Sequence, residues 1–199
     1  MTKEINKKMT KRLCVVDFDG CLFNTPEPLE GKPMWEKHYS QPYPHKGWWG
    51  RKESLDTNVF DIKPIPSILN KLKSDVADKN TVVIILTSRM EKLRPEIENI
   101  LKLNNIVVDE VIMKKGREDK GDVILKIADY NPDLEQIDVY DDFAGKLPNK
   151  ITELTKIMND LPYDVQYNIY YVENGNTELL ESTNNLIKMI QEEINNLKQ

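Results

Sequence analysis

The stretch Leu-Cys-Val-Val-Asp-Phe-Asp-Gly, residues 13–20, decides the fold. Its four leading apolar residues predict a strand that is buried on both sides, as in the centre of a parallel sheet. Side chains two apart on a strand point the same way, so Asp17 and Asp19 face one place at the strand's carboxyl end. Gly20 allows the chain to turn sharply there. An Asp-Gly turn alone would explain Asp19 and Gly20, but it leaves Asp17 unexplained.

Outward from this stretch, short apolar segments alternate with segments of helical period. We expect strands at 13–18, 81–86, 110–113, 136–140 and 165–172. Helices are expected at about 66–75, 94–103, 122–130, 149–160 and 184–197. This alternation is typical of βαβ units, so the sequence predicts an α/β fold with a central parallel sheet.

One segment interrupts the alternation. Residues 26–64 hold all three tryptophans, both histidines and many of the prolines, with no clear period. A structureless connection of that length is uncommon unless it has a function. We therefore divide the chain into a basic tail at 1–12 and one domain at 13–199, with an aromatic-rich insertion at about 26–64. Two separate folded domains would be cramped within 199 residues.

The charge and composition exclude several classes of protein. A net charge of -5 argues against a surface built throughout to hold a polyanion. Two local basic clusters remain, one of Lys7, Lys8, Lys11 and Arg12 and one of Lys114, Lys115, Arg117 and Lys120. The first is interpreted as a solvated tail, and the second as either a loop or a basic cleft. With no apolar run of about 20 residues and only two cysteines, we expect a cytoplasmic protein without membrane contact.

Polar residues follow two further predicted strands. Thr87-Ser88-Arg89 follows the second, and Asp141-Asp142 follows the fourth. Hydroxyl and guanidinium groups suit a phosphate oxygen, although Thr87 or Ser88 could simply cap a helix and the acidic pair could form a turn. Open α/β sheets bind ligands at the carboxyl ends of their strands, so three such ends predict one site.

Carboxylates gathered in this way require cations. A hard cation such as Mg²⁺ is the usual partner of adjacent carboxylates. For the cationic side chain we choose Lys126, in the helix before the Asp141-Asp142 strand, with Lys114 and Lys115 as rivals.

Residues 17–25, Thr87, Lys126 and the pair Asp141-Asp142 resemble, in order, the four motifs of the haloacid dehalogenase (HAD)-like phosphatases. The resemblance implies a Rossmannoid three-layer sandwich with a small cap after the first strand. It implies that Asp17 attacks phosphorus, that Asp19 transfers the proton, and that Thr87 and Lys126 hold the phosphoryl oxygens. Mg²⁺ would lie on Asp17, the carbonyl of Asp19, and Asp141 or Asp142.

A narrower resemblance concerns the substrate. Residues 25–28, Trp35, residues 47–50 and residues 86–89 resemble the HAD domain of Swiss Army knife RNA repair proteins. Residues 121–126 are similar to the third motif of polynucleotide 3′-phosphatases, whereas Phe143 stands where those enzymes often have a basic residue. The resemblance implies a phosphorylated RNA or DNA end as substrate, and an RNA repair ligase or kinase as partner.

The tryptophans of the insertion allow two interpretations. Trp35, Trp48 and Trp49 could form a small core that anchors the insertion. Alternatively, Trp48 and Trp49 could stack on bases while Arg51 or Lys46 contacts a backbone phosphate. Two other functions stay open: hydrolysis of a nucleotide or small phosphomonoester, and nucleic-acid binding by a decayed site. The presence of Asp17, Asp19, Thr87 and Lys126 argues against decay.

Overall fold

The computed structural model describes residues 10–113, 119–143, 149–162 and 164–183. Within these ranges, six strands form one sheet in the order β3-β2-β1-β4-β5-β6, and all neighbours are parallel except β5 and β6. The strands are β1 (Arg12–Val16), β2 (Thr81–Thr87), β3 (Glu110–Met113), β4 (Gln136–Asp141), β5 (Gln166–Glu173) and β6 (Asn176–Ser182).

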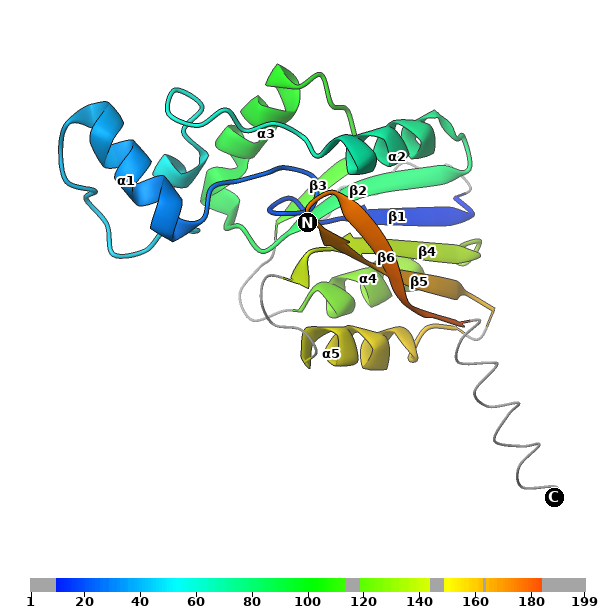
Figure 1. Cartoon of the computed structure of the whole chain (residues 1–199). Coiled ribbons are helices and arrows are strands. Elements are labelled where there is room, and N and C mark those ends of the chain that lie inside the picture. Colours follow the sequence, from blue (N-terminus) through cyan, green and yellow to red (C-terminus); the bar gives the residue numbers. More distant parts are fainter. Residues whose placement is uncertain (1–9, 114–118, 144–148, 163, 184–199) are drawn as a thin grey trace.

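Helices cover both faces of this sheet (Figure 1). On one face, α2 (Pro66–Ala77) and α3 (Arg94–Leu103) pack over a cluster that includes Cys14 and Val16. On the other, α4 (Lys120–Asp129) and α5 (Asn149–Met158) pack over a cluster that includes Leu13 and Val15. Alternate residues of β1 thus enter opposite cores, and the predicted α/β, three-layer fold is confirmed.

The central position of β1 sets the location of the site. Val16 pairs with Ile85 of β2 on one side and with Tyr140 of β4 on the other. Because all three strands are parallel, their carboxyl ends lie at one edge of the sheet. The backbone N–H of Asp17 extends the pairing by donating to the carbonyl of Tyr140 at 2.9 Å.

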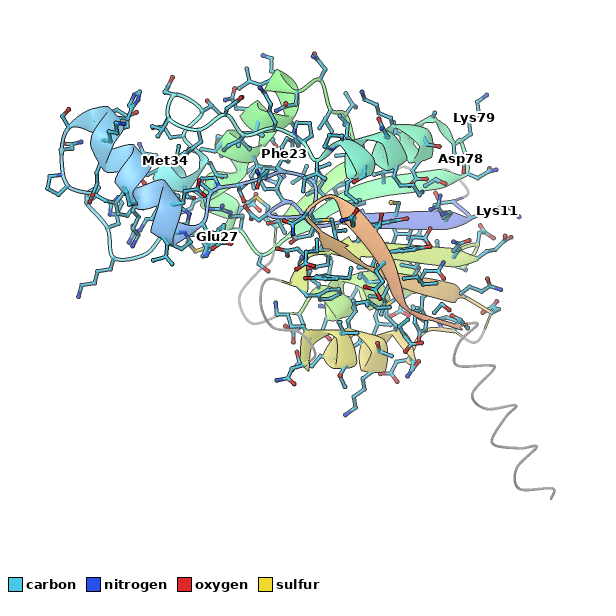
Figure 2. All side chains as sticks on the ribbon, viewed as in Figure 1. Lys11, Phe23, Glu27, Met34, Asp78 and Lys79 are labelled. Atoms are coloured by element: carbon cyan, nitrogen blue, oxygen red, sulfur yellow. The ribbon has the colours of Figure 1, made fainter. Side chains whose placement is uncertain are left out.

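The predicted insertion contains regular structure that its sequence pattern did not indicate. It includes α1 (Pro28–Tyr39) and the short 3₁₀ helix η1 (Lys52–Leu55), and η2 (Glu91–Leu93) follows β2. In Figure 1, α1 stands away from the sheet, beyond the carboxyl ends of β1 and β2. Figure 2 shows Phe23 between the sheet and α1, Glu27 and Met34 at α1, and Lys11, Asp78 and Lys79 at the opposite end of the strands.

The structure differs from the sequence prediction in other places. β1 begins at Arg12, inside the predicted tail, and β6 is an additional antiparallel strand. The predicted helix at 184–197 lies outside the described residues. Among the helices that are described, none has both the length and the apolar character needed to cross a bilayer.

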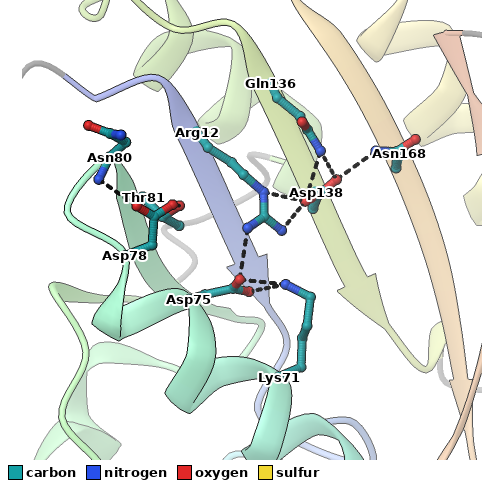
Figure 3. A network of polar contacts seen from close by, with 9 residues as sticks. All are labelled: Arg12, Lys71, Asp75, Asp78, Asn80, Thr81, Gln136, Asp138 and Asn168. Atoms are coloured by element: carbon teal, nitrogen blue, oxygen red, sulfur yellow. Dashed lines mark hydrogen bonds and ion pairs between the residues drawn. The ribbon is translucent and has the colours of Figure 1, made fainter.

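A buried polar network braces the amino ends of the strands (Figure 3). The guanidinium of Arg12 bonds to Asp138 of β4 and, at 2.7 Å, to Asp75 of α2. Asp138 also accepts bonds from Gln136 and Asn168. Both carboxylates are almost fully buried, so without these partners each would be a buried, unpaired charge that destabilises the fold.

Candidate active site

Three carboxylates meet at the carboxyl edge of the sheet. Asp17 follows β1, Asp141 ends β4 and Asp142 comes next, and one oxygen from each lies within 4.8 Å of the others. Gly20, with φ of 68°, makes room for this group, since a Cβ there would lie 2.2 Å from an oxygen of Asp142. The Asp-Gly pair is thus more than a turn, because the glycine permits a third carboxylate to approach.

Lys120 supplies the cation at this cluster. Its Nζ lies 2.7 Å from Asp17 Oδ1 and 2.6 Å from Asp141 Oδ2. Lys120 is the first residue of α4, whose start is fixed by a capping box between Asp119 and Asp122. The cap therefore determines where the ammonium group lies.

The choice of Lys126 is corrected by this geometry. Lys126 is exposed on α4 and lies six positions after Lys120, which is about 9 Å along a helix axis. Its rivals Lys114 and Lys115 lie outside the described residues. Lys120 was noted in the sequence only as part of a basic cluster. The pattern Asp119-x-x-Asp122 was the missed signal, because it begins the helix at 120 instead of 122.

Electrostatics at the cluster favour an added cation. Burial raises the pKa of Asp17 to about 8; Asp141 and Asp19 add to the rise, while Lys120 opposes it. Burial alone would lower the pKa of Lys120, but Asp17 and Asp141 raise it well above its ordinary value. In the part of the chain that the structure describes, these acidic groups outnumber the basic groups seen in ion pairs with them, Lys120 and Arg89. An oxygen-only donor set with excess negative charge fits Mg²⁺.

Asp19 lies beside this cluster and has partners of its own. Arg89 binds it through two parallel bonds, Nε to Oδ2 at 2.9 Å and Nη2 to Oδ1 at 2.8 Å. The hydroxyl of Thr25 donates to Oδ1 at 2.8 Å. The carboxylate of Asp19 is not part of the three-carboxylate group. The contact with a metal that is predicted for Asp19 uses its backbone carbonyl instead.

The residues after β2 have different environments. Thr87 is buried, and its Oγ1 accepts the backbone N–H of Arg89 at 3.1 Å, a bond that does not use the hydroxyl hydrogen. That hydrogen can be donated to a phosphoryl oxygen. Ser88 is exposed, whereas Arg89 is buried against Asp19 and is not open to solvent as a substrate-binding residue would be.

The tryptophans divide between the two interpretations. Trp35 and Trp48 are buried; Trp48 donates from Nε1 to the carbonyl of Pro26 at 2.8 Å. The prediction that Trp48 stacks on a base is therefore wrong, because its ring is packed in the core of the insertion. Trp49 is 39% exposed, and the guanidinium of Arg89 lies 4.9 Å from its ring centroid. Arg51 is exposed, and within the described ranges no side-chain bond joins it to the carboxylates.

Comparison with known proteins assigns the family. Residues 36–198 match the family described as HAD domain family 1 in Swiss Army Knife RNA repair proteins. The chain belongs to this family. The match begins after Asp17 and Asp19, so it does not test the roles expected of these two residues. The family supports a HAD-type phosphohydrolase.

A curated relative adds little about function. A protein of Saccharomyces cerevisiae, named as uncharacterized, is 26% identical over 165 residues. That alignment covers 70% of this chain and 36% of the yeast protein. No solved structure matches the chain significantly.

Proposed function

We propose that this protein is a Mg²⁺-dependent phosphatase that uses Asp17 as its nucleophile and removes a terminal phosphate from RNA or DNA. The observation that carries the proposal is the position of the Lys120 ammonium group, bonded to both Asp17 and Asp141 beside Asp142. A carboxylate, a cation and a cluster of oxygen donors are the groups that phosphoryl transfer needs at one point.

The residues divide the chemistry between them. An oxygen of Asp17 attacks phosphorus to form an aspartyl phosphate, and Asp19 gives its proton to the leaving oxygen. Asp19 then takes a proton from the water that hydrolyses the intermediate. Lys120 and the hydroxyl of Thr87 hold the phosphoryl oxygens. When bound to Asp17, Asp141 and Asp142, Mg²⁺ would neutralise charge on the phosphoryl group.

The substrate proposal is supported by the family and by Trp49. The family takes its name from RNA repair proteins. Trp49 is a half-exposed ring whose neighbour Arg89 is bonded to Asp19, so a base stacked on it would lie near the reacting phosphate. Aromatic rings bind single-stranded nucleic acid in this way without sequence preference. A ligase or kinase acting on the same ends is the partner that this substrate suggests.

A substrate panel tests the proposal. Oligonucleotides of RNA and DNA with a 3′, 5′ or cyclic phosphate are compared with mononucleotides and p-nitrophenyl phosphate, with Mg²⁺ and with a chelator. We expect Mg²⁺-dependent release of phosphate that is lost in Asp17→Asn and is fastest with one class of oligonucleotide end. Turnover that survives the substitution would contradict the role of Asp17, and a preference for mononucleotides would favour a nucleotidase.

A further inference from the structure

Arg89 makes nearly all the hydrogen bonds that its guanidinium can offer. Nε and Nη2 bind the two oxygens of Asp19, while Nη1 donates to the carbonyl of Trp49 at 2.6 Å and to Ser54 Oγ at 2.5 Å. The residue is 3% exposed. Four of its five N–H groups are thus used within the protein, so no two N–H groups remain to bind a phosphate together.

The partners of Arg89 come from two parts of the chain. Asp19 follows the central strand β1, whereas Trp49 and Ser54 belong to the predicted insertion, with Ser54 in η1 and fully buried. The ring of Trp49 adds a cation–π contact to the same guanidinium. One buried side chain therefore connects the insertion directly to the carboxylate of Asp19.

We propose that Arg89 is a positioning residue that orients the carboxylate of Asp19 toward the leaving oxygen. This orientation depends on the packing of the insertion against Arg89. The inference rests on the proposed phosphatase activity, but it gives Arg89 a different role from phosphate binding. A planar guanidinium that binds both oxygens of a carboxylate fixes its rotation. The bonds of Arg89 to Trp49 and Ser54 fix the guanidinium in turn.

The bonding pattern also distinguishes the two oxygens of Asp19. Oδ1 accepts from Arg89 and from Thr25, whereas Oδ2 accepts only from Arg89 among the described residues. Oδ2 keeps a lone pair for the transferred proton. In the first step the bond between Asp17 and phosphorus forms, the bond from phosphorus to the leaving oxygen breaks, and the proton passes from Asp19 Oδ2 to that oxygen.

The test compares leaving groups. An alkyl phosphate, such as a ribose 3′-phosphate, needs protonation as its bond to phosphorus breaks, whereas the phenolate of p-nitrophenyl phosphate leaves with little help. We expect Arg89→Lys to lower kcat/KM, which reports steps up to release of the leaving group, for the alkyl ester about tenfold or more beyond its effect on the aryl ester, because lysine cannot form the two parallel bonds. Ser54→Ala should shift the same ratio in the same direction, by less.

The outcomes separate the possible roles. Equal losses of kcat/KM on both esters in Arg89→Lys and Ser54→Ala would overturn the positioning role. A rise in KM on both esters with kcat unchanged would instead show that Arg89 binds phosphate. If Arg89→Lys fails to fold, Ser54→Ala gives the same comparison. A wild-type protein that hydrolyses neither the esters nor any phosphorylated end would contradict the proposed function itself.

Discussion

At the scale of single residues, position within a helix decides which lysine reaches the carboxylates. Lys120 and Lys126 are both on α4, yet only Lys120 contacts Asp17 and Asp141. The two lysines therefore form a matched pair for experiment. They carry the same charge, and they differ in their distance from the carboxylates.

We predict that Lys120→Ala lowers kcat/KM about a hundredfold or more, since it removes a cation from the phosphoryl group. Lys126→Ala should leave kcat/KM within about twofold, as expected of an exposed position. Steady-state kinetics on one substrate checks both variants. A larger loss in Lys126→Ala than in Lys120→Ala would contradict the assigned geometry.

A second prediction at this scale concerns Gly20. A methyl group there would clash with the carboxylate of Asp142 and would strain a backbone with positive φ. We expect Gly20→Ala to weaken Mg²⁺ binding about tenfold or more, because a displaced carboxylate no longer shares the ion. Titration calorimetry with Mg²⁺ measures the change, and Gly47→Ala, where a Cβ meets nothing within 4 Å, is the control. Equal affinities in the two variants would rule out this role for Gly20.

At the scale of elements, the parallel strands were predictable and two other elements were not. The strands around β1 are continuous apolar runs between helical segments, and such runs indicate a buried parallel sheet. α1 was missed because it carries Pro33 and Gly31 and lacks a clear apolar stripe. β6 was missed although Asn174-Gly175, both with positive φ, is a typical hairpin turn.

The two adjacent tryptophans of the insertion differ in environment, and their variants should differ in effect. Trp48→Ala removes a buried ring that packs over Gly31, so the free energy of unfolding should fall by about 3–5 kcal/mol. Trp49→Ala should change stability little and should raise KM for an oligonucleotide about tenfold more than for p-nitrophenyl phosphate. Denaturant unfolding and kinetics measure these effects. Leu29→Ala, another exposed apolar position of the insertion, is the control.

Two results would contradict the stacking role of Trp49. An equal rise in KM for the oligonucleotide and for p-nitrophenyl phosphate in Trp49→Ala would mean that the ring binds no base. A similar rise in Leu29→Ala would mean that the effect is not specific to Trp49.

At the scale of the whole molecule, polar groups at opposite ends of the sheet serve different purposes. At the amino ends, Asp75 is paired with Arg12 and Lys71, and burial, which alone would raise its pKa, is outweighed by these hydrogen bonds, so the pKa is lowered. At the carboxyl ends, burial raises the pKa of Asp17. The first arrangement favours the ionised carboxylate and stability, whereas the second leaves negative charge for a cation to balance.

The lowered pKa of Asp75 predicts how stability depends on pH. The carboxylate stabilises the folded state above the unfolded pKa of about 4, and this contribution is lost as pH falls through the lower folded pKa. Asp75→Asn should therefore cost about 3 kcal/mol at neutral pH, and the cost should shrink as the pH falls below the unfolded pKa of about 4. Urea unfolding at several pH values measures it. A cost that does not change with pH would contradict the ion-pair account.

The site was predictable to the extent that strand ends define it. Asp17, Asp141 and Asp142 end parallel neighbours of one sheet, so their convergence follows from the fold. Which lysine joins them depends on where α4 starts, and whether Arg89 faces phosphate or Asp19 depends on how the insertion packs. The start of α4 follows from the local capping pattern of Asp119 and Asp122. The direction of Arg89 depends on contacts between segments far apart in the chain, which no local pattern contains.

The central claim is that Asp17 becomes phosphorylated during turnover. The most direct measurement is mass spectrometry of peptides from protein quenched in acid during hydrolysis, with the Asp17→Asn variant as control. We predict that the peptide containing Asp17 gains the mass of one phosphoryl group and that the variant does not. A protein that turns over substrate with no phosphorylated peptide, or with the group on another residue, would contradict the account.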